Sequence, residues 1–416
     1  MLKTTRSRLC EIIMVVFQDT TLDFEDLKLR LIREGATDYF IPDPLYYVKD
    51  KYSYLPTELP VFYNPLMEIN RDLSILALKA YMSIVGSLEV YIEALAGTGI
   101  RGFRVYNEVS RNILIIQNDI NPLAYKLMNF NKEYWNIPDE KMRLYKEDAN
   151  FLLYYLLKKE KIRPDAIEID PYGTPAPFLA STLNAIKGKN GLVLITATDT
   201  APLTGKYPNP ALRKYAVLLK KSPFSKEVAV RALIYAIGKE ATVFSKRIIP
   251  LFGFFMHHFI KIAAIVTRGK KEADKFWREV GWVILKNSYF SIHNDIIPPC
   301  GEELIGPLWI GMIYNKAFLQ EMINELKKSR ISKRNKQIIE RILSWEIEIP
   351  EQPFYYDLHL LASELKANPP PIDKVINALK SLGYEAVRTH FGNWCVRTNA
   401  PIEVLKNVIK GKNGLT

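Results

Sequence analysis

A carboxylate, a proline, an aromatic ring and a glycine follow one another directly after an apolar run. The segment Asp170-Pro171-Tyr172-Gly173-Thr174-Pro175 comes after Ala166-Ile167-Glu168-Ile169, which predicts a buried strand. A carboxylate at the end of such a strand can accept hydrogen bonds from the exocyclic amine of a purine, localise its lone pair and take the leaving proton. The ring of Tyr172 can stack on the base, a contact worth roughly 1–3 kcal/mol. The alternative is an ordinary Asp-Pro turn after a buried strand.

A second segment has the pattern of a nucleotide-binding turn. The strand-like run Val90-Tyr91-Ile92-Glu93-Ala94-Leu95 leads into Gly97-Thr98-Gly99-Ile100-Arg101-Gly102, and a helix-like stretch follows over Phe103–Val109. Glycines such as Gly97 and Gly99 in this position let a ligand approach the backbone closely. The next predicted strand, in Asn112–Asp119, ends in an acid twenty residues after Gly99, where it can accept hydrogen bonds from ribose hydroxyls.

The glycine pattern by itself fits a nicotinamide enzyme equally well. The Asp170 segment on a later strand favours a different nucleoside, the methyl donor S-adenosylmethionine, because a dehydrogenase does not need that segment. A third acid, Asp148, follows another short predicted strand and can meet the amino group of adenine.

The motifs extend along most of the chain in one order. They begin with Ile32-Arg33-Glu34-Gly35, Val61-Phe62-Tyr63-Asn64-Pro65 and Asn70-Arg71-Asp72, and continue with Gly99-Ile100-Arg101, Asn118-Asp119-Ile120-Asn121-Pro122 and the Asp170 segment. Further motifs are Thr196-Ala197-Thr198-Asp199-Thr200-Ala201, Gly306-Pro307-Leu308-Trp309-Ile310-Gly311, Tyr356-Asp357-Leu358-His359, Arg388-Thr389-His390-Phe391 and Arg397-Thr398-Asn399-Ala400-Pro401. With these motifs, over roughly residues 26 to 410, the chain resembles the tRNA (guanine-N2)-dimethyltransferases that modify the guanine at tRNA position 26, and specifically an archaeal-like member.

The resemblance implies roles for particular residues. Arg71, Arg101, Asp119, Asp148 and Ala149 would contact the methyl donor, Asp170 would be the catalytic carboxylate, and tRNA would be the partner. The family usually has phenylalanine where this chain has Tyr172, which keeps the stacking face and adds a hydroxyl group.

The charge of the chain is consistent with a polyanionic partner. Its 416 residues carry a formal net charge of +12 and the pI is about 9.2. The densest basic stretch contains no acid and comprises Lys327, Lys328, Arg330, Lys333, Arg334 and Lys336. We expect RNA contact at Lys327, Lys328 and Arg330, with a solvated helix face as the equally weighted alternative.

The cysteines and apolar runs favour a cytoplasmic protein without a membrane span or an obligate protein partner. Cys10, Cys300 and Cys395 are few and odd in number, which indicates free thiols in a reducing compartment. The apolar run that ends at Phe17 is too short for a signal peptide. The stretch from Ile248 to Val266 is interrupted by His257, His258 and Lys261, so we expect a buried core strand there.

The pattern predicts an α/β protein with two domains after an N-terminal extension over residues 1–25. A Rossmann-like class I methyltransferase domain is expected over 26–268, with helices in Pro122–Phe130, Ala149–Lys159 and Lys226–Tyr235. A smaller α+β domain is expected over 269–416, and the resemblance makes it the tRNA-binding part. There Pro369-Pro370-Pro371 introduces a helix that ends before Gly383, and strands follow in Glu385–Thr389 and Trp394–Thr398.

Two other classes of function remain open from the residues. One is an amino-methyltransferase that acts on another substrate, such as adenine in DNA or a glutamine side chain of a protein. The other is a non-catalytic RNA-binding module with a relic pocket, against which the intact set of Arg71, Arg101, Asp119 and Asp170 argues.

The sequence also predicts that the protein binds no zinc. Many relatives carry paired cysteines in the second domain, but this chain has only Cys300 there, whereas a structural zinc site needs four ligands. Elemental analysis of the purified protein should therefore find substoichiometric zinc, and a chelator should leave its melting temperature unchanged. One bound zinc per chain would contradict this prediction.

Overall fold

The computed structural model describes residues 17–48, 55–301, 303–348 and 352–411, and its chain divides into two compact units. Unit 1 comprises residues 1–170, 185–187 and 324–339, and unit 2 comprises residues 171–184, 188–323 and 340–416. The apolar run before Phe17 lies outside the described residues, and so does Cys10. The sequence-based boundary at residue 268 stays a prediction.

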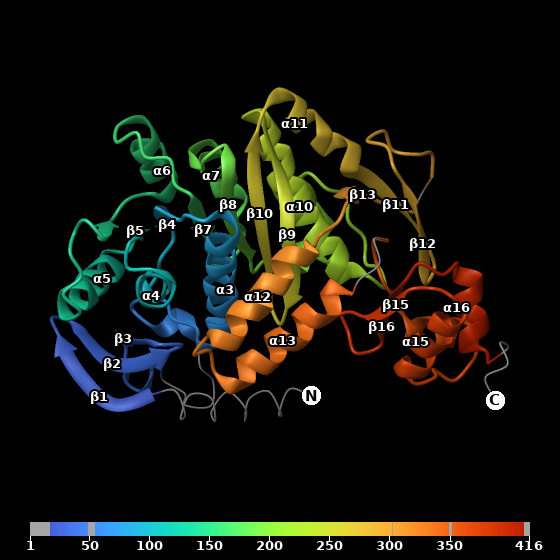
Figure 1. The fold of residues 1–416 in the computed structure, drawn as a ribbon, viewed down its shortest axis with the longest axis horizontal. Coiled ribbons are helices and arrows are strands. Elements are labelled where there is room, and N and C mark those ends of the chain that lie inside the picture. The colour runs from blue at the N-terminus through green and yellow to red at the C-terminus, as the bar shows by residue number, and fades with distance from the viewer. Residues whose placement is uncertain (1–16, 49–54, 302, 349–351, 412–416) are drawn as a thin grey trace. The chain divides into compact units, whose positions relative to one another are not determined.

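Unit 1 begins with an antiparallel sheet and continues as alternating strands and helices (Figure 1). Its strands are β1 (Phe17–Phe24), β2 (Leu27–Glu34), β3 (Thr37–Pro42), β4 (Val90–Glu93), β5 (Leu114–Asn118), β6 (Met142–Tyr145) and β7 (Ala166–Ile169). Its helices are α2 (Pro44–Tyr47), η1 (Pro56–Glu58), η2 (Pro65–Met67), α3 (Glu68–Val85), α4 (Ile100–Arg104), η3 (Val105–Val109), α5 (Pro122–Tyr134) and α6 (Ala149–Lys158).

The four later strands of unit 1 form the ladder β6-β5-β4-β7, and every pairing in it is parallel. Numbered by their place among these four strands, the order is 3-2-1-4, which is the order of a Rossmann fold. In such a sheet the ligand binds beyond the carboxyl ends of the strands, where the order reverses next to the first strand. Asp119 and Asp170 each directly follow one of these carboxyl ends, as the sequence predicts.

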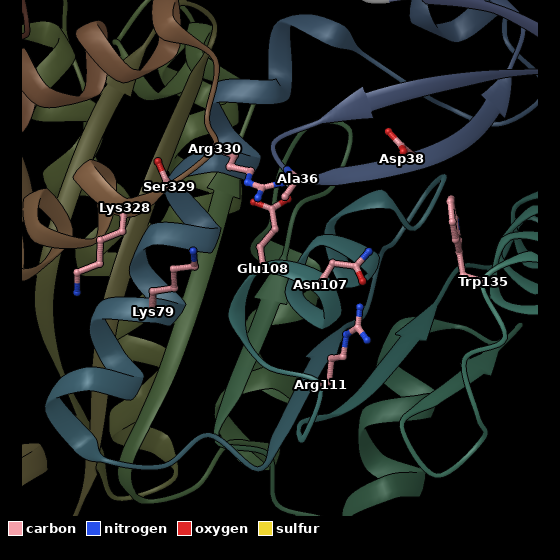
Figure 2. Close-up of a pocket in the computed structure, with 10 residues that line it drawn as sticks. All are labelled: Ala36, Asp38, Lys79, Asn107, Glu108, Arg111, Trp135, Lys328, Ser329 and Arg330. Atoms are coloured by element: carbon pink, nitrogen blue, oxygen red, sulfur yellow. Dashed lines mark hydrogen bonds between the residues drawn. The ribbon is translucent and has the colours of Figure 1, made fainter.

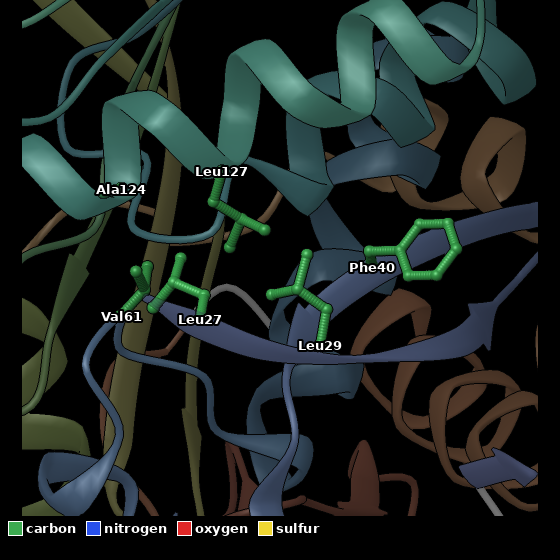
Figure 3. Packing of buried hydrophobic residues seen from close by; sticks show 6 residues of the cluster. All are labelled: Leu27, Leu29, Phe40, Val61, Ala124 and Leu127. Atoms are coloured by element: carbon green, nitrogen blue, oxygen red, sulfur yellow. The ribbon is translucent and has the colours of Figure 1, made fainter. Parts of the chain in front are cut away.

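A small core joins the first sheet to α5. Leu27 and Leu29 of β2, Phe40 of β3, Val61, and Ala124 and Leu127 of α5 are buried together (Figure 3). The apolar residues of α5 recur at helical spacing, so one side of the helix faces this cluster. The Asn131 side chain completes the contact because it accepts from the Phe40 backbone N–H and donates to the Phe40 carbonyl, at 2.9 and 3.0 Å.

Unit 2 contains antiparallel sheets and the remaining helices. Its strands are β8 (Lys189–Ala197), β9 (Lys246–Met256), β10 (Phe259–Arg268), β11 (Val280–Lys286), β12 (Tyr289–His293), β13 (Leu304–Trp309), β14 (Tyr356–Asp357), β15 (Ala386–Arg388) and β16 (Cys395–Thr398). Its helices are η4 (Ala176–Phe178), α7 (Leu179–Ala185), α8 (Thr200–Leu203), α9 (Pro208–Tyr215), α10 (Ser225–Val243), α11 (Lys270–Phe276), η5 (Trp277–Glu279), α14 (Leu358–Glu364), α15 (Ile372–Ser381) and α16 (Ile402–Ile409). Two further helices, α12 (Lys316–Lys328) and α13 (Lys333–Ile347), have residues in both units.

The apolar stretch from Ile248 to Val266 is not one strand, as the sequence analysis expected, but the hairpin of β9 and β10. The polar pair His257 and His258 forms its turn, and His257 takes a left-handed conformation with φ of 46°. The predicted buried character is correct, because residues such as Ile260 and Ala263 are fully buried. None of the helices in the described part of the chain is long and apolar enough to cross a membrane.

The C-terminal residues form the α+β arrangement that the sequence predicts. The helix after the triple proline is α15, and Gly383 follows it with φ of 85°. The two predicted strands pair antiparallel as β15 and β16, and β14 pairs with β16 on its other edge.

Candidate active site

The turn after β4 has a backbone that only glycine adopts easily. Gly97 and Gly99 have φ of 55° and 84°, in the left-handed region. A Cβ atom at Gly99 would lie 2.6 Å from Cγ of Met128, so a side chain does not fit there. Gly99 is also the N-cap residue of α4. The sequence therefore places two glycines where the backbone must come close to a ligand and to α5.

Asp119 is held against this turn. Its carboxylate accepts hydrogen bonds from the backbone N–H of Gly97 at 2.7 Å and of Asn121 at 2.9 Å. Burial raises the pKa of Asp119, and these two hydrogen bonds oppose that effect. Each carboxylate oxygen has a second lone pair, so the group can still accept from the hydroxyls of a ligand.

Asp148 lies at the same edge of the sheet as Asp119. β5 and β6 are parallel, and Asn118 is in register with Tyr145, so the residues that follow the two strands emerge side by side. Asp148 is exposed and is the N-cap of α6, where it accepts from the Phe151 N–H at 3.0 Å. Ala149 is the buried first residue of that helix.

Arg101 lies beneath Asp170 rather than at the surface. Its side chain is only 4 % exposed, and one guanidinium nitrogen donates to Oδ2 of Asp170 and, at 3.1 Å, to Oδ1 of Asn70. The other terminal nitrogen donates to Oε1 of Glu93 at 3.0 Å and lies 3.7 Å from a Glu168 carboxylate oxygen. The arginine therefore fixes the Asp170 carboxylate at the carboxyl end of β7.

The charges around Arg101 are not balanced. Burial lowers the pKa of the Arg101 guanidinium. The negative charges of Glu168, Asp170 and Glu93 together raise it by more, so the pKa is above its ordinary value. Burial also raises the pKa of Glu93 to about 7, although Arg101 lowers it. Glu168 and Asp170 add to the effect of burial on Glu93, because one buried cation faces three carboxylates.

Arg71 lies in a second buried network, which connects the β2–β3 hairpin to α3. Its Nε donates to Glu34 at 2.8 Å, and its guanidinium lies 5.3 Å from the centre of the Tyr63 ring. The Tyr63 hydroxyl donates to the same Glu34 carboxylate at 2.8 Å. Arg104 lies 2.7 Å from Asp72 in an ion pair, so the hairpin, α3 and α4 share one network.

In unit 2, the segment after Asp170 is supported by residues near the end of β8. The Gly173 N–H donates to the Thr198 hydroxyl at 2.7 Å, and Gly173 has φ of 112°. The Thr174 hydroxyl lies 2.8 Å from the Tyr215 hydroxyl, which in turn donates to Asp199 at 2.6 Å. Tyr172 is 80 % exposed, so most of its surface is accessible.

Sequence reasoning missed several residues that hold this site. Glu93, Asn70 and Gln117 are buried, and the Gln117 amide donates to Glu93 at 2.7 Å and to the Gly99 carbonyl at 2.6 Å. The available signal was a polar residue inside an otherwise apolar strand, at Glu93 and at Gln117. No sequence pattern indicated Tyr215, because only the tertiary structure brings its hydroxyl to Thr174 and Asp199.

The remaining predicted residues lie elsewhere. Lys327 and Lys328 end α12, and Arg330 is in the turn before α13; all three are exposed. His390 is structural: its Nδ1 pairs with Glu346 at 2.6 Å and its Nε2 accepts from the Phe255 N–H. Among the described residues, no group of three or more His, Cys, Asp and Glu side chains could hold a metal ion. The expectation of no zinc stays a prediction.

A Rossmann strand order, a glycine turn and acids at successive strand ends define a nucleotide-binding α/β enzyme. The family model described as "N2,N2-dimethylguanosine tRNA methyltransferase" matches residues 44–410. A tRNA (guanine(26)-N(2))-dimethyltransferase of Saccharolobus solfataricus is 35% identical over 395 residues, covering 92% of this chain and 99% of the relative. The enzyme of the same name from Methanobrevibacter smithii is 32% identical, covering 93% of this chain and 98% of the relative.

The chain is also similar to a solved structure over most of its length. Trm1 from Pyrococcus horikoshii, determined in complex with S-adenosyl-L-methionine, superposes with a TM-score of 0.81 at 28% identity, covering 91% of this chain and 99% of that one. The chain belongs to the N2,N2-dimethylguanosine tRNA methyltransferase family.

The raised pKa of Glu93 predicts a pH dependence of folding. Between the ordinary value of 4.5 and about 7, the unfolded chain loses this proton whereas the folded chain keeps it. The wild-type protein should therefore lose stability as the pH rises through this window, and Glu93→Gln, which has no proton to lose, should lose less. Denaturant unfolding from pH 4 to 8 measures the difference, which should be constant above about pH 7. Parallel curves for the two proteins throughout would contradict the prediction.

Proposed function

We propose that this protein transfers methyl groups from S-adenosylmethionine to the exocyclic N2 of a guanine in tRNA. The observation that carries the proposal is the Asp170 carboxylate, fixed by Arg101 at the carboxyl end of β7 in a member of this family. The relatives are named for guanine 26, so we assign position 26 as the target. The products are N2-methylguanine and N2,N2-dimethylguanine.

The residues after β4, β5 and β6 fit the methyl donor. The positive φ angles of Gly97 and Gly99 form a turn that carries no side chains at these two positions, and Asp119 retains acceptor capacity for ribose hydroxyls. Asp148 and Ala149 at the start of α6 are assigned to the adenine. When bound, S-adenosylmethionine supplies an electrophilic methyl group on a sulfonium. Arg71 and Arg101, both buried, are assigned to contact the methyl donor.

Asp170 is assigned to the chemistry on the guanine. The N2 lone pair is delocalised into the ring, and a carboxylate that accepts hydrogen bonds from the amine localises it. As nitrogen forms its bond to the methyl carbon, the bond from that carbon to the donor's sulfur would break and release the thioether S-adenosylhomocysteine, and the carboxylate accepts or relays the proton that leaves nitrogen. The monomethylated amine still has one proton, so the same group can serve a second transfer.

Tyr172 is assigned to stack on the guanine. Its ring is exposed, and the turn that carries it is stiffened by Pro171 and by the Gly173 hydrogen bond to Thr198. The target guanine is stacked within tRNA and must turn outward to meet these groups, at a cost of a few kcal/mol. A stacking partner outside the RNA offsets part of that cost.

Contacts to the tRNA backbone are assigned to the basic residues Lys327, Lys328 and Arg330 and to the region after residue 268. Their support is the net charge of +12 and the exposure of all three side chains. We further assign the protein to the cytoplasm, where its tRNA substrate is, without an obligate protein partner.

Asp119 predicts a clear preference among nucleoside ligands. Asp119→Asn keeps the size of the side chain and one acceptor oxygen, but it removes the charge from the hydrogen bonds to the ribose. Hydrogen bonds to a charged group contribute about 1.5–3 kcal/mol and neutral ones about 0.5–1.5 kcal/mol, so S-adenosylmethionine should bind about five- to tenfold more weakly. Calorimetry measures this, with Asp274→Asn on the exposed side of α11 as the matched control. Tight binding of NAD to the wild-type protein would contradict the assignment.

Asp170 predicts a separation of chemistry from binding. Asp170→Asn removes the charge that localises the lone pair, and a general acid–base role of this kind contributes about 10²–10⁴-fold. Turnover should fall by that order while tRNA affinity, which depends mainly on phosphate contacts, changes only a few-fold. Mass spectrometry of nucleosides from treated tRNA measures both methylated products. Near-normal turnover of the variant would make Asp170 a structural turn residue, and methylation of DNA adenine or protein glutamine instead of tRNA would overturn the proposed function.

A further inference from the structure

Unit 1 contains a polar pocket that the proposed chemistry does not use. Its volume is about 530 Å³, within the range of roughly 300–1,000 Å³ that is typical of ligand sites. The lining residues come from the β2–β3 turn and β3, from α3, from η3 and the segment after it, from the residue after α5, and from the end of α12 with the turn that follows (Figure 2). They are Ala36, Asp38, Lys79, Asn107, Glu108, Arg111, Trp135, Lys328, Ser329 and Arg330.

The pocket lies away from the methyl-donor site within the same unit. Arg111 precedes β5 and Asp119 follows it, so the two residues are at opposite ends of a strand of five residues, about 15 Å long. The pocket is therefore separate from the Gly97–Gly99 turn, and a ligand bound in it contacts different residues.

The two carboxylates of the pocket already accept hydrogen bonds, mostly from groups outside it. Glu108 accepts from Nε of Arg104 at 2.9 Å, from the Thr37 hydroxyl at 3.1 Å and from the Ala36 N–H at 3.2 Å. Asp38 forms a two-bond ion pair with Arg33, at 2.5 and 2.7 Å. Neither carboxylate is paired with a cation that lines the pocket.

The cations are much less compensated. Lys79 feels the negative charges of Glu108 and Glu325, but no hydrogen bond or ion pair within 4 Å is found for Lys79 or Arg330 among the described residues. Arg111 lies over the Tyr106 ring at 5.6 Å, and Lys328 has a solvent-exposed pair with Glu325 at 2.8 Å. Lys79 is half-buried on α3, and burial lowers the pKa of its ammonium group, whereas the charges of Glu108 and Glu325 raise it. Four positive groups thus line one hollow together with two carboxylates, Glu108 and Asp38, whose ion pairs are with Arg104 and Arg33 outside it.

The neutral residues of the pocket suit a nucleic acid. The Asn107 amide and the Ser329 hydroxyl can donate hydrogen bonds to phosphate or sugar oxygens. Trp135 is partly exposed and offers a flat face to a base or a ribose. The basic run that includes Lys328 and Arg330 extends through the turn into α13 as far as Lys336. It therefore offers further positive charges to successive phosphates of one strand.

We propose that this pocket binds a phosphodiester of the tRNA backbone, with Lys79 and Arg330 as its principal charged contacts. The proposal rests on the proposed function and specifies where the substrate is held outside the reacting nucleotide. It includes Lys79 and Arg111, which the sequence did not single out, and excludes Lys327, which does not line the pocket. The pocket positions the tRNA and takes no part in methyl transfer.

The test uses Lys79→Met and Arg330→Gln in the full chain, each alone and together. Dissociation constants for tRNA are measured by fluorescence anisotropy across a range of KCl concentrations. Each variant should weaken binding, and the slope of log affinity against log salt should become shallower by about one for each lost phosphate contact. The affinity for S-adenosylmethionine should stay at the wild-type value, because the pocket does not include the residues assigned to the methyl donor.

Matched variants separate a binding role from a structural one. Lys79→Arg keeps the charge and should restore affinity and slope, whereas a purely structural defect would not respond to charge. Arg163→Gln removes an exposed arginine in the loop before β7, outside the pocket, and should leave the slope unchanged. Melting temperatures verify folding, and exposed Arg330 carries the test if the Lys79 variant unfolds.

Three outcomes decide the question. A loss of affinity with a shallower salt slope, restored by Lys79→Arg, supports the proposal. Wild-type affinity and slope in both variants, in an enzyme that methylates tRNA, overturn it and leave the proposed function intact. Binding of inorganic phosphate that is lost in Lys79→Met without a change in tRNA affinity also overturns it, because the pocket would then hold a small free anion. A wild-type protein that methylates no tRNA would instead refute the proposed function.

Discussion

A single buried guanidinium organises the catalytic end of unit 1. Arg101 contacts carboxylates from β4 and from the end of β7, and Asn70 on α3 accepts from the same group. Removing one charge from such a buried network leaves the others uncompensated, which typically costs about 3–5 kcal/mol. With three carboxylates around one arginine, negative charge exceeds positive charge. The raised pKa of Glu93 means that this carboxyl group reduces the excess when it holds a proton. The position of Asp170 thus depends on a balance of charges around Arg101, and this balance requires that Arg101 remain buried away from water.

The neighbouring network of Arg71, Arg104, Glu34 and Asp72 extends the same principle to the N-terminal hairpin. Here two arginines face two buried carboxylates and Glu108, and Asn335 of α13 donates to Asp72 at 2.8 Å. Buried polar groups are costly when they lose their partners, which favours one arrangement of the hairpin, α3, α4 and the first turns of α13. The Lys79–Arg330 pocket borders this network through Glu108. A buried network of ion pairs next to several cations is a suitable arrangement for holding a phosphate in a defined position.

The sequence anticipated the strands and their terminal acids well because both leave local signals. Apolar runs of four to six residues became β4, β5 and β7, and Asp119, Asp148 and Asp170 follow strands as expected. The glycines of the 97–99 turn are required by its positive φ angles. The single strand expected over 248–266 was wrong, because the periodicity of an apolar run does not reveal a two-residue turn inside it. The roles of Lys327, Lys328 and Arg330 stay predictions, since exposure alone does not distinguish contact from solvation.

By itself, the sequence determined the fold class, the family and the identity of the groups that follow the strands, because these depend on residue type and local spacing. Only the tertiary structure decided which groups meet. Glu93 and Glu168 are inside apolar strands and look like exceptions to a pattern until parallel pairing places them beside Arg101. Lys79 and Arg330 are about 250 residues apart and share a pocket only because the α12–α13 turn returns to unit 1. Electrostatic energy depends on distance in space and on burial, and neither quantity is written in the order of residues along the chain.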